Sequence, residues 1–364
     1  MKFPSALRHA ALKRYRHQLL SSLLAAVGRT QARSRPIGGD ALAVHRVLIV
    51  RPVHSLGNLL ALTSLLTELE QTFPGAEVDV AVALPIAGDL FCKFPQVGQV
   101  FLLPRHVPRN PLRYLWQLSL LRGRRYDLVI NPTANSNSGR ILAHLLGPRF
   151  ALDGVDQPLR QSGQCHFARA PVLTLRQQLA TNGDRPLPPL DLRLDAAERQ
   201  WGKATFDHLT RPARPDAAGR LALFTGGTGD KRLQPAWWQA FHDVLRQQLD
   251  GFEFIEILPA DGQSALADKV PTFYSTHLRR VAAVISAADA FVGTDSGIMH
   301  LASAANRPTI GLFTTADPVV WSPFGPAECL AMAAGPDGRR CAGRACPEIL
   351  RMVGASRIVP SPGG

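Results

Sequence analysis

The sequence predicts an α/β protein with two domains, each built on a doubly wound parallel sheet. Two series of alternating strand and helix patterns run along the 364 residues, and a proline-rich stretch at residues 183–193 separates them. Strands that alternate with helices imply parallel βαβ units. A chain of this length has room for two medium domains.

The first series opens with a buried strand at His45–Arg51, which follows the Gly38-Gly39 break. Its apolar run predicts a central strand, and the later patterns alternate between periods of about 3.6 and 2 residues. The expected elements are a helix at 59–73, strands at 77–83 and 97–103, a helix at 112–122, a strand at 127–131 and a helix at 138–146.

The second series starts after the proline-rich stretch, which suits an interdomain connection. Its expected elements are a strand at 220–224, a helix at 235–249, a strand at 252–258, a helix at 278–288, a strand at 288–294, a helix at 298–305, a strand at 306–313 and a loop at 314–325. We expect domains at residues 44–190 and 191–345, preceded by a basic segment at 1–43 and followed by a tail at 346–364. Ligands of such sheets bind at the carboxyl ends of the strands.

Composition indicates an ordinary globular protein, with 46% hydrophobic and 19% charged residues. No apolar run approaches the roughly 20 residues that cross a bilayer. The five cysteines are scattered and odd in number, which favours a reduced compartment and a cytoplasmic location. Cys329, Cys341 and Cys346 lack a fourth ligand at zinc-site spacing, so we expect no metal.

The net charge of +13 is concentrated at the N-terminus, where residues 1–43 carry eight Lys and Arg and one Asp, a net +7. Leu7, Ala11, Tyr15, Leu19 and Leu23 follow helical spacing there. The segment fits a helix lying on an anionic membrane surface, and equally a solvated basic tail. Nucleic acid is a poor fit because no binding motif accompanies the charge.

The motif Gly293-Thr-Asp-Ser-Gly-Ile-Met-His300 lies between a predicted strand and a helix. Ser296 and Gly297 fall at the helix N-terminus, where free N–H groups and the helix dipole favour phosphate. We expect Asp295 to orient the turn or to meet sugar hydroxyls. His300 either contacts the ligand or packs from inside the helix. The triplet Asp-Ser-Gly alone also fits an ordinary helix cap.

A second motif, Thr225-Gly-Gly-Thr-Gly-Asp-Lys-Arg232, follows the first strand of the second series. Its glycines let backbone amides approach a diphosphate, and Lys231 supplies a positive charge. Thr228 and Arg232 are further candidates for donor binding. Asp261, after the next strand, stands where such domains often hold ribose hydroxyls. An exposed loop with incidental glycines is the alternative.

The stretch that begins with the Gly293–His300 motif and continues through the expected strand at 306–313 and the loop at 314–325 resembles the C-terminal signature of glycosyltransferase family 9, the ADP-heptose:lipopolysaccharide heptosyltransferases. The match covers Asp295, Ser296, Gly297, His300, Ala304, Pro308, Asp317 and Pro318, and Lys231-Arg232 fits a second family loop. The resemblance implies GT-B architecture, in which two Rossmann-like domains face a cleft. It also implies a nucleotide-sugar donor in the second domain and an acceptor in the first.

The family places a catalytic Asp after Gly in the first loop, and this chain has Gly57-Asn58. An amide cannot serve as general base. Another residue therefore takes the proton, or Asn58 orients the acceptor while the leaving diphosphate takes it, or catalysis is lost. His54 is the natural substitute because imidazole titrates near neutral pH; the alternative is that His54 caps the strand.

Basic residues also collect in the first domain at Arg105, Arg109 and Arg113. They fit an acceptor that carries phosphorylated sugar acids, and equally a solvated cationic face.

The resemblance implies an inverting, metal-independent transfer of a heptose or related sugar from an ADP-heptose type donor to a lipopolysaccharide-type acceptor. The reaction needs no cofactor and takes place at the inner face of the cytoplasmic membrane. The rival hypothesis is a non-catalytic protein that binds sugar nucleotides or glycolipids and has lost its base.

Overall fold

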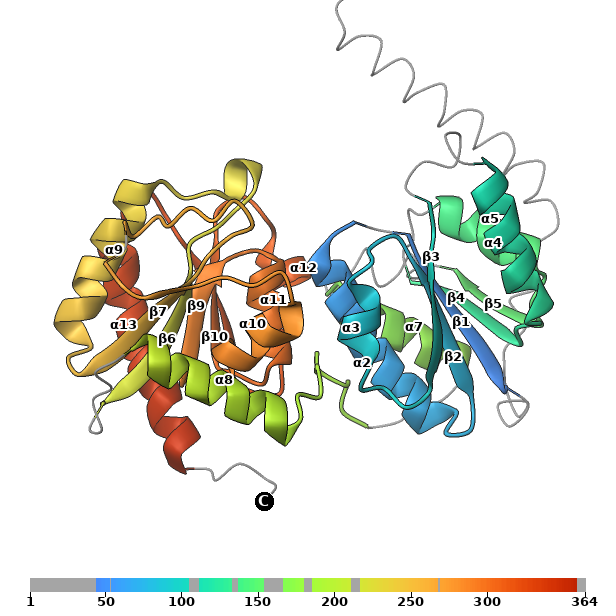
Figure 1. The fold of residues 1–364 in the computed structure, drawn as a ribbon, viewed down its shortest axis with the longest axis horizontal. Coiled ribbons are helices and arrows are strands. Elements are labelled where there is room, and N and C mark those ends of the chain that lie inside the picture. Colours follow the sequence, from blue (N-terminus) through green and yellow to red (C-terminus); the bar gives the residue numbers. More distant parts are fainter. Residues whose placement is uncertain are drawn as a thin grey trace, which may run out of the picture.

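The computed structural model describes residues 44–52, 54–104, 111–132, 137–153, 166–179, 185–210, 217–267 and 269–358. The basic segment 1–43, with its expected membrane-surface helix, lies outside these residues. Figure 1 shows two α/β domains side by side, joined through helices and loops at their facing sides.

The first domain has a five-stranded parallel sheet in the order β3-β2-β1-β4-β5. Its strands and helices, in chain order, are β1 (Arg46–Arg51), α2 (Leu56–Thr72), β2 (Glu77–Val82), α3 (Ala87–Phe91), β3 (Val97–Leu102), α4 (Pro111–Gly123), β4 (Leu128–Asn131), α5 (Asn137–Leu146) and β5 (Phe150–Asp153). One core cluster lies between the sheet and α2, and another lies between the sheet and α4 and α5. The domain is therefore doubly wound.

Two helices connect the domains, α7 (Arg169–Gln178) and α8 (Ala196–Leu209). Helix α7 packs on α2, where the buried Glu68 carboxylate accepts from Nε and Nη2 of Arg176 at 2.8 and 2.7 Å. The segment between α7 and α8 contacts the second domain: the Leu190 and Leu192 N–H groups donate to the carbonyls of Phe324 and Ala304.

The second domain has a six-stranded parallel sheet in the order β11-β10-β9-β6-β7-β8. Its elements are β6 (Gly219–Phe224), the 3-10 helix η3 (Gly229–Lys231), α9 (Pro235–Gln248), β7 (Phe252–Ile257), β8 (Thr272–Phe273), α10 (Leu278–Ile285), β9 (Ala290–Thr294), α11 (Gly297–Ala304), β10 (Thr309–Phe313), α12 (Pro318–Trp321), β11 (Cys329–Ala333) and α13 (Gly338–Ile358). Helices α9 and α13 pack together on one face, and α10 and α11 lie on the other.

The predicted strands and helices are all present, with ends shifted by up to three residues. Two differences stand out. The loop expected at 314–325 contains α12, which begins because Asp317 accepts the Val319 N–H at 2.9 Å and Pro318 occupies the first turn. The boundary expected at residue 345 falls inside α13, whose Ile349, Met352 and Val353 are buried in the second-domain core.

The two domains meet where the N-termini of α2 and α11 touch. Two glycines allow the approach: a Cβ at Gly57 would lie 2.8 Å from Cδ2 of His300, and one at Gly297 would lie 2.6 Å from Cβ of Leu56. One continuous cluster of buried side chains extends from the first sheet through α2 to α11 and β9. The contact therefore brings the start of α2, which carries Asn58, next to the motif that carries Asp295, before α11.

Candidate functional site

The loops that follow β6, β9 and β10 meet at the carboxyl edge of the second sheet. The Thr294 hydroxyl donates to the Gly226 carbonyl, and Thr314 Oγ1 donates to the Asp230 carbonyl at 3.2 Å. Strands β6 and β9 are neighbours, yet the chain leaves them in opposite directions across the sheet. This is the switch point at which doubly wound sheets bind ligands.

At this switch point Lys231 and Asp295 form an ion pair, with Nζ 2.5 Å from Oδ2. Lys231 ends η3, where Gly229 takes a φ of +56° that favours glycine. The Asp295 side chain is buried, whereas Lys231 is about one-third exposed. Of the two partners, Lys231 is therefore the one that solvent reaches.

Helix α11 begins directly beside this pair. Ser296 is its N-cap and its Oγ accepts the Met299 N–H at 3.3 Å, which confirms the predicted helix start at Ser296 and Gly297. The first-turn amides of a helix carry partial positive charge. A lysine and a helix N-terminus thus converge on one edge, which is a suitable arrangement for an anion.

His300 is buried in the interdomain contact. Its ring lies 4.6 Å from the Phe167 ring, and it also meets Gly57 of the first domain. Burial lowers its pKa from 6.5 to about 3, so the imidazole is neutral at physiological pH. Of the two roles expected from the sequence, this position agrees with packing from inside the helix.

His166 and Phe167 contact α12 and Ser322, the residue that follows it. The Phe167 N–H donates to the Val320 carbonyl at 3.1 Å, and its ring lies 5.0 Å from that of Trp321. His166 Nε2 lies 2.9 Å from the Ser322 carbonyl oxygen. Burial lowers the His166 pKa to about 4, so a second neutral histidine lies in the contact.

The other donor-site candidates lie on the exposed rim. Arg232 and Asp261 approach each other at 3.9 Å, and both side chains are about half exposed. Thr228 precedes η3 and is exposed. Asp261 therefore lies next to the Arg232 guanidinium, at the end of the glycine-rich loop.

Glu256 is a buried carboxylate that sequence reasoning missed. It lies on β7 and accepts from the hydroxyls of Thr225 and Ser264, each at 2.5 Å. It thereby ties the glycine-rich loop to the loop that carries Asp261. The signal in the sequence was a charged residue inside the apolar strand Phe-Glu-Phe-Ile-Glu-Ile, because a buried charge requires specific partners.

On the first domain, Asn58 occupies the first turn of α2 beside the end of β1. Its Oδ1 accepts from Arg51 Nη2 at 2.5 Å, and its Nδ2 donates to Ser55 Oγ at 2.6 Å. Both polar atoms of the amide are thus engaged. His54 is exposed in the same loop.

Arg51 is a buried cation next to Asn58. Burial lowers its pKa from 12.5 to about 10, which still leaves it protonated at neutral pH. Within the described part of the chain, its Nε and Nη1 have no hydrogen-bond partner. Asn58 is therefore a neutral acceptor where a carboxylate would form an ion pair.

The predicted acceptor arginines are not placed. Arg105 and Arg109 lie outside the described residues, and Arg113 lies on α4 with its side chain undescribed. The role of these arginines stays a prediction.

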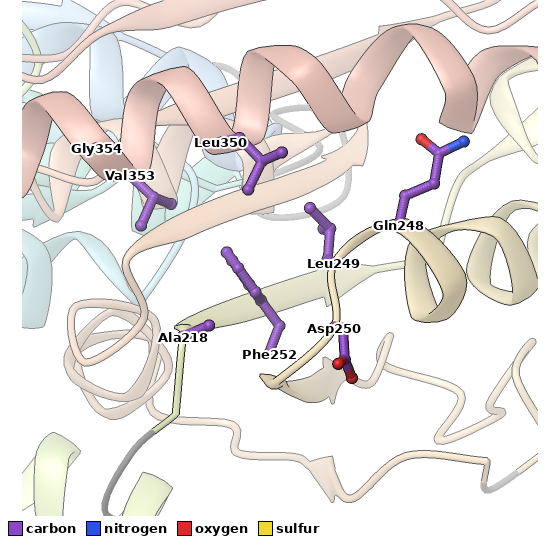
Figure 2. Close-up of a pocket in the computed structure, with 8 residues that line it drawn as sticks. All are labelled: Ala218, Gln248, Leu249, Asp250, Phe252, Leu350, Val353 and Gly354. Atoms are coloured by element: carbon purple, nitrogen blue, oxygen red, sulfur yellow. The ribbon is translucent and has the colours of Figure 1, made fainter.

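A pocket of about 240 Å³ lies elsewhere on the second domain. Figure 2 shows it between the C-terminal part of α13, the end of α9 and the start of β7. Phe252 opens β7, so the pocket is at the amino edge of the sheet and far from the loops described above. Its lining is mostly apolar, and we assign it no role in the chemistry.

The described residues contain no group of three or more His, Cys, Asp or Glu side chains arranged to hold a metal ion. None of the helices built from them combines the length and apolar character of a transmembrane span.

Comparisons with known proteins agree with the signature. The sequence model of glycosyltransferase family 9 (heptosyltransferase) matches residues 272–346. Lipopolysaccharide heptosyltransferase 1 of Escherichia coli O18:K1:H7 is 24% identical over 329 residues, which cover 80% of this chain and 92% of that protein. The resemblance to glycosyltransferase family 9 is thereby confirmed.

Solved structures show the same fold. E. coli ADP-heptose lipopolysaccharide heptosyltransferase II superposes with a TM-score of 0.64 at 17% identity, covering 86% of this chain and 99% of that one. E. coli heptosyltransferase WaaC, solved with ADP, gives a TM-score of 0.59 at 20% identity and covers 85% and 99%. The expected GT-B architecture is confirmed.

Proposed function

We propose that this protein is a glycosyltransferase that moves a heptose or related sugar from an ADP-heptose type donor to a lipopolysaccharide core or similar glycan acceptor. The observation that carries the proposal is the Lys231–Asp295 pair beside the α11 N-terminus, at the switch point of the second sheet. The family match at residues 272–346 includes Asp295 and α11. The proposal places the acceptor in the first domain, at the loop that carries Asn58.

The donor diphosphate competes with Asp295 for Lys231. Lys231 is the more exposed partner, so it can turn toward phosphate while Asp295 stays in place. The α11 amides face the same edge and share the charge that develops on the leaving group. Asp295, released from the lysine, accepts hydrogen bonds from sugar hydroxyls. In this proposal the leaving diphosphate is stabilised without an essential metal.

The acceptor hydroxyl is deprotonated by a group other than Asn58. The Asn58 amide is engaged by Arg51 and Ser55 and has no proton-accepting carboxylate. We assign the base to His54, which is exposed in the same loop. Attack on the face opposite the leaving group inverts the anomeric centre. Asn58 orients the acceptor.

The site of action is the cytoplasm, with a peripheral position at the inner face of the cytoplasmic membrane. A lipopolysaccharide-type acceptor is anchored in a membrane, so a transferase that uses it works at that surface. The net charge of +13 supports attraction to anionic lipid.

The rival is a binding protein that kept the donor pocket and lost catalysis. The Asn58 amide favours it, because that position lacks the carboxylate of the family pattern. Both hypotheses require donor binding, and they differ in turnover.

Calorimetry with ADP tests the donor site shared by both hypotheses. Lys231→Ala removes the cation that meets the diphosphate, and we expect ADP affinity to fall about 10-fold to 100-fold, as for loss of one charge-assisted contact. Lys269→Ala is the matched control, since Lys269 pairs with Asp243 at 3.1 Å elsewhere in the second domain. Equal affinity in wild type and Lys231→Ala would remove Lys231 from the donor site.

A further inference from the structure

Helices α4 and α5 present large apolar side chains to solvent. Leu115, Trp116 and Leu120 on α4 are 58%, 61% and 42% exposed, and Leu145 on α5 is 37% exposed. These four are half of the eight large hydrophobic residues that are exposed in the described part of the chain. The two helices are in contact, so the four residues belong to neighbouring elements. We call Leu115, Trp116, Leu120 and Leu145 the α4–α5 face.

This exposure is not caused by a helix that fails to pack. The opposite side of α4 is anchored: Leu121 is buried in the first-domain core, Leu118 packs against that core, and the Gln117 side chain donates to the Leu102 carbonyl. With 3.6 residues per turn, Leu115, Trp116 and Leu120 lie on the side away from Gln117 and Leu121. Helix α4 is thus apolar on two sides, whereas a surface helix is normally polar toward water.

The same region is strongly cationic. Residues 111–149, which span α4 and α5, contain six Arg and a single acidic residue, Asp127. One of the six, Arg124, is paired with Glu77 and Asp79 of β2. Oδ2 of Asp127 accepts from the backbone N–H groups of His45 and Arg46, each at 2.9 Å. Arg122 and Arg125 directly follow the apolar stripe of α4, and both are exposed. Apolar groups bordered by cations match the chemistry of an anionic bilayer surface.

The position in the fold suits an enzyme whose acceptor is in a membrane. Figure 1 shows α4 and α5 on the side of the first domain that is far from the second domain, so the interdomain contact leaves them uncovered. The parallel strands have their carboxyl ends at one edge, and both α2 and α4 start from that edge. Leu115 and Trp116, in the first half of α4, therefore lie toward the edge where Asn58 lies.

We propose that the α4–α5 face docks the protein on an anionic lipid bilayer, with Leu115, Trp116 and Leu120 entering the headgroup region and Arg122 and Arg125 contacting lipid phosphates. The assignment of an anionic membrane as the partner rests on the proposed function. The binding itself needs no sugar nucleotide, so it is measured independently of turnover.

Tryptophan fluorescence tests the proposal on the full chain. Residues 1–43 contain no tryptophan, and the other four, Trp201, Trp237, Trp238 and Trp321, lie in the second half of the chain. The difference between wild type and Trp116→Phe thus isolates Trp116. We expect brominated vesicles of phosphatidylglycerol and phosphatidylcholine to quench this difference signal and shift it to the blue, and pure phosphatidylcholine vesicles to have little effect.

Variants locate the contact further. Leu115→Ser combined with Leu120→Ser should weaken binding to the anionic vesicles at least 10-fold. Leu350→Ser, at a 49% exposed leucine on α13, is the matched control and should bind as wild type does. Near-identical circular dichroism spectra confirm that the variants are folded.

Three results would overturn the proposal. The first is that the vesicles bind the protein without quenching Trp116, which would assign binding to residues 1–43 or another surface. The second is the absence of vesicle binding. The third is a Trp116 shift that depends on protein concentration without lipid, which would identify a second copy of the chain as the occupant.

Discussion

Asn58 defines the chemistry of the first domain at the scale of single residues. Its carbonyl oxygen is held by the buried Arg51 and its amide nitrogen by Ser55, at 2.5 and 2.6 Å. The amide is thereby fixed in one orientation, and the proposed transfer reaction requires another group as proton acceptor. His54 is the nearest titratable candidate in the sequence.

Replacing His54 tests that assignment. If His54 is the base, His54→Ala should lower kcat by about 100-fold or more, the usual contribution of a positioned general base. ADP affinity should stay unchanged, because the donor site belongs to the second domain. Steady-state kinetics and calorimetry on the same preparation measure both. Unchanged turnover in this variant would exclude His54.

Asn58→Asp separates an enzyme from a decayed relative. The new carboxylate would pair with the Arg51 cation, and we expect the free energy of unfolding to rise by about 1 to 3 kcal/mol. Urea unfolding measures this change. Turnover should stay the same or fall in an enzyme that uses another base, whereas a rise in turnover would support the decayed protein. Asn58→Ala, which leaves Arg51 without this acceptor, should be less stable than wild type.

His300 and His166 make the stability dependent on pH. Burial lowers their pKa from 6.5 to about 3 and about 4, so the unfolded chain binds protons that the folded chain does not bind. Above pH 6.5 the two histidines do not lower the free energy of unfolding. Below pH 6.5 the unfolded chain binds protons, so the free energy of unfolding falls as the pH falls. At pH 5 each histidine should lower the free energy of unfolding by about 2 kcal/mol relative to its value at neutral pH.

Urea unfolding at pH 7.5 and pH 5 checks this dependence. His300→Phe keeps an aromatic ring against Phe167 and removes the titrating group. Between pH 7.5 and pH 5, the free energy of unfolding of this variant should therefore fall by about 2 kcal/mol less than that of wild type. His144→Phe, at a histidine in α5 far from the interdomain contact, is the control. An equal loss in wild type and His300→Phe would contradict the buried neutral state.

At the scale of elements, the N-termini of α2 and α11 meet through two glycines. A methyl group at Gly297 would lie 2.6 Å from Cβ of Leu56, which cannot move without shifting α2. We expect Gly297→Ala to lower the free energy of unfolding by about 1 to 3 kcal/mol through overpacking. Gly343→Ala is the control: outside the adjacent backbone of its own helix, nothing lies within 4 Å of the added methyl group, and we expect the substitution to stabilise α13 by up to about 1 kcal/mol. Calorimetric melting of both variants decides whether the two helices pack as described.

The elements found from the sequence were those with strong local patterns. The buried strands β1, β6 and β9 are apolar runs, and Ser296 is the N-cap at which α11 starts. A few consecutive residues were therefore enough to predict each of these elements. Helix α13 was not predicted because it contains Pro347 and three glycines, and its helical state depends on packing against α9. Strand β11 is a half-exposed edge strand, which leaves little periodic signal.

The sequence indicated which loops form the candidate site, but not the contacts between them. The loops that carry Lys231 and Asp295 were found, because glycines, hydroxyls and charges follow strands. Their ion pair was not predicted, since it depends on β6 and β9 being neighbours, a fact of topology. The same applies to the bond between Arg51 and Asn58 and to the loop contacts of Glu256.

At the scale of the whole molecule, the two sheets share one continuous core through α2 and α11. The predicted donor loops and the loop of Asn58 thus lie on either side of a packed contact, and the carboxyl edges of both sheets supply the functional groups. The central claim of the proposed function is that this arrangement brings the donor and the acceptor together in one site.

An acceptor-dependent release of nucleoside diphosphate tests that claim most directly. The purified full chain is incubated with ADP-heptose and a truncated lipopolysaccharide acceptor, with other nucleotide sugars in parallel and Lys231→Ala as the control. We expect release of ADP that requires both the acceptor and Lys231. Donor binding without release across a panel of acceptors would contradict the transferase and favour the binding protein.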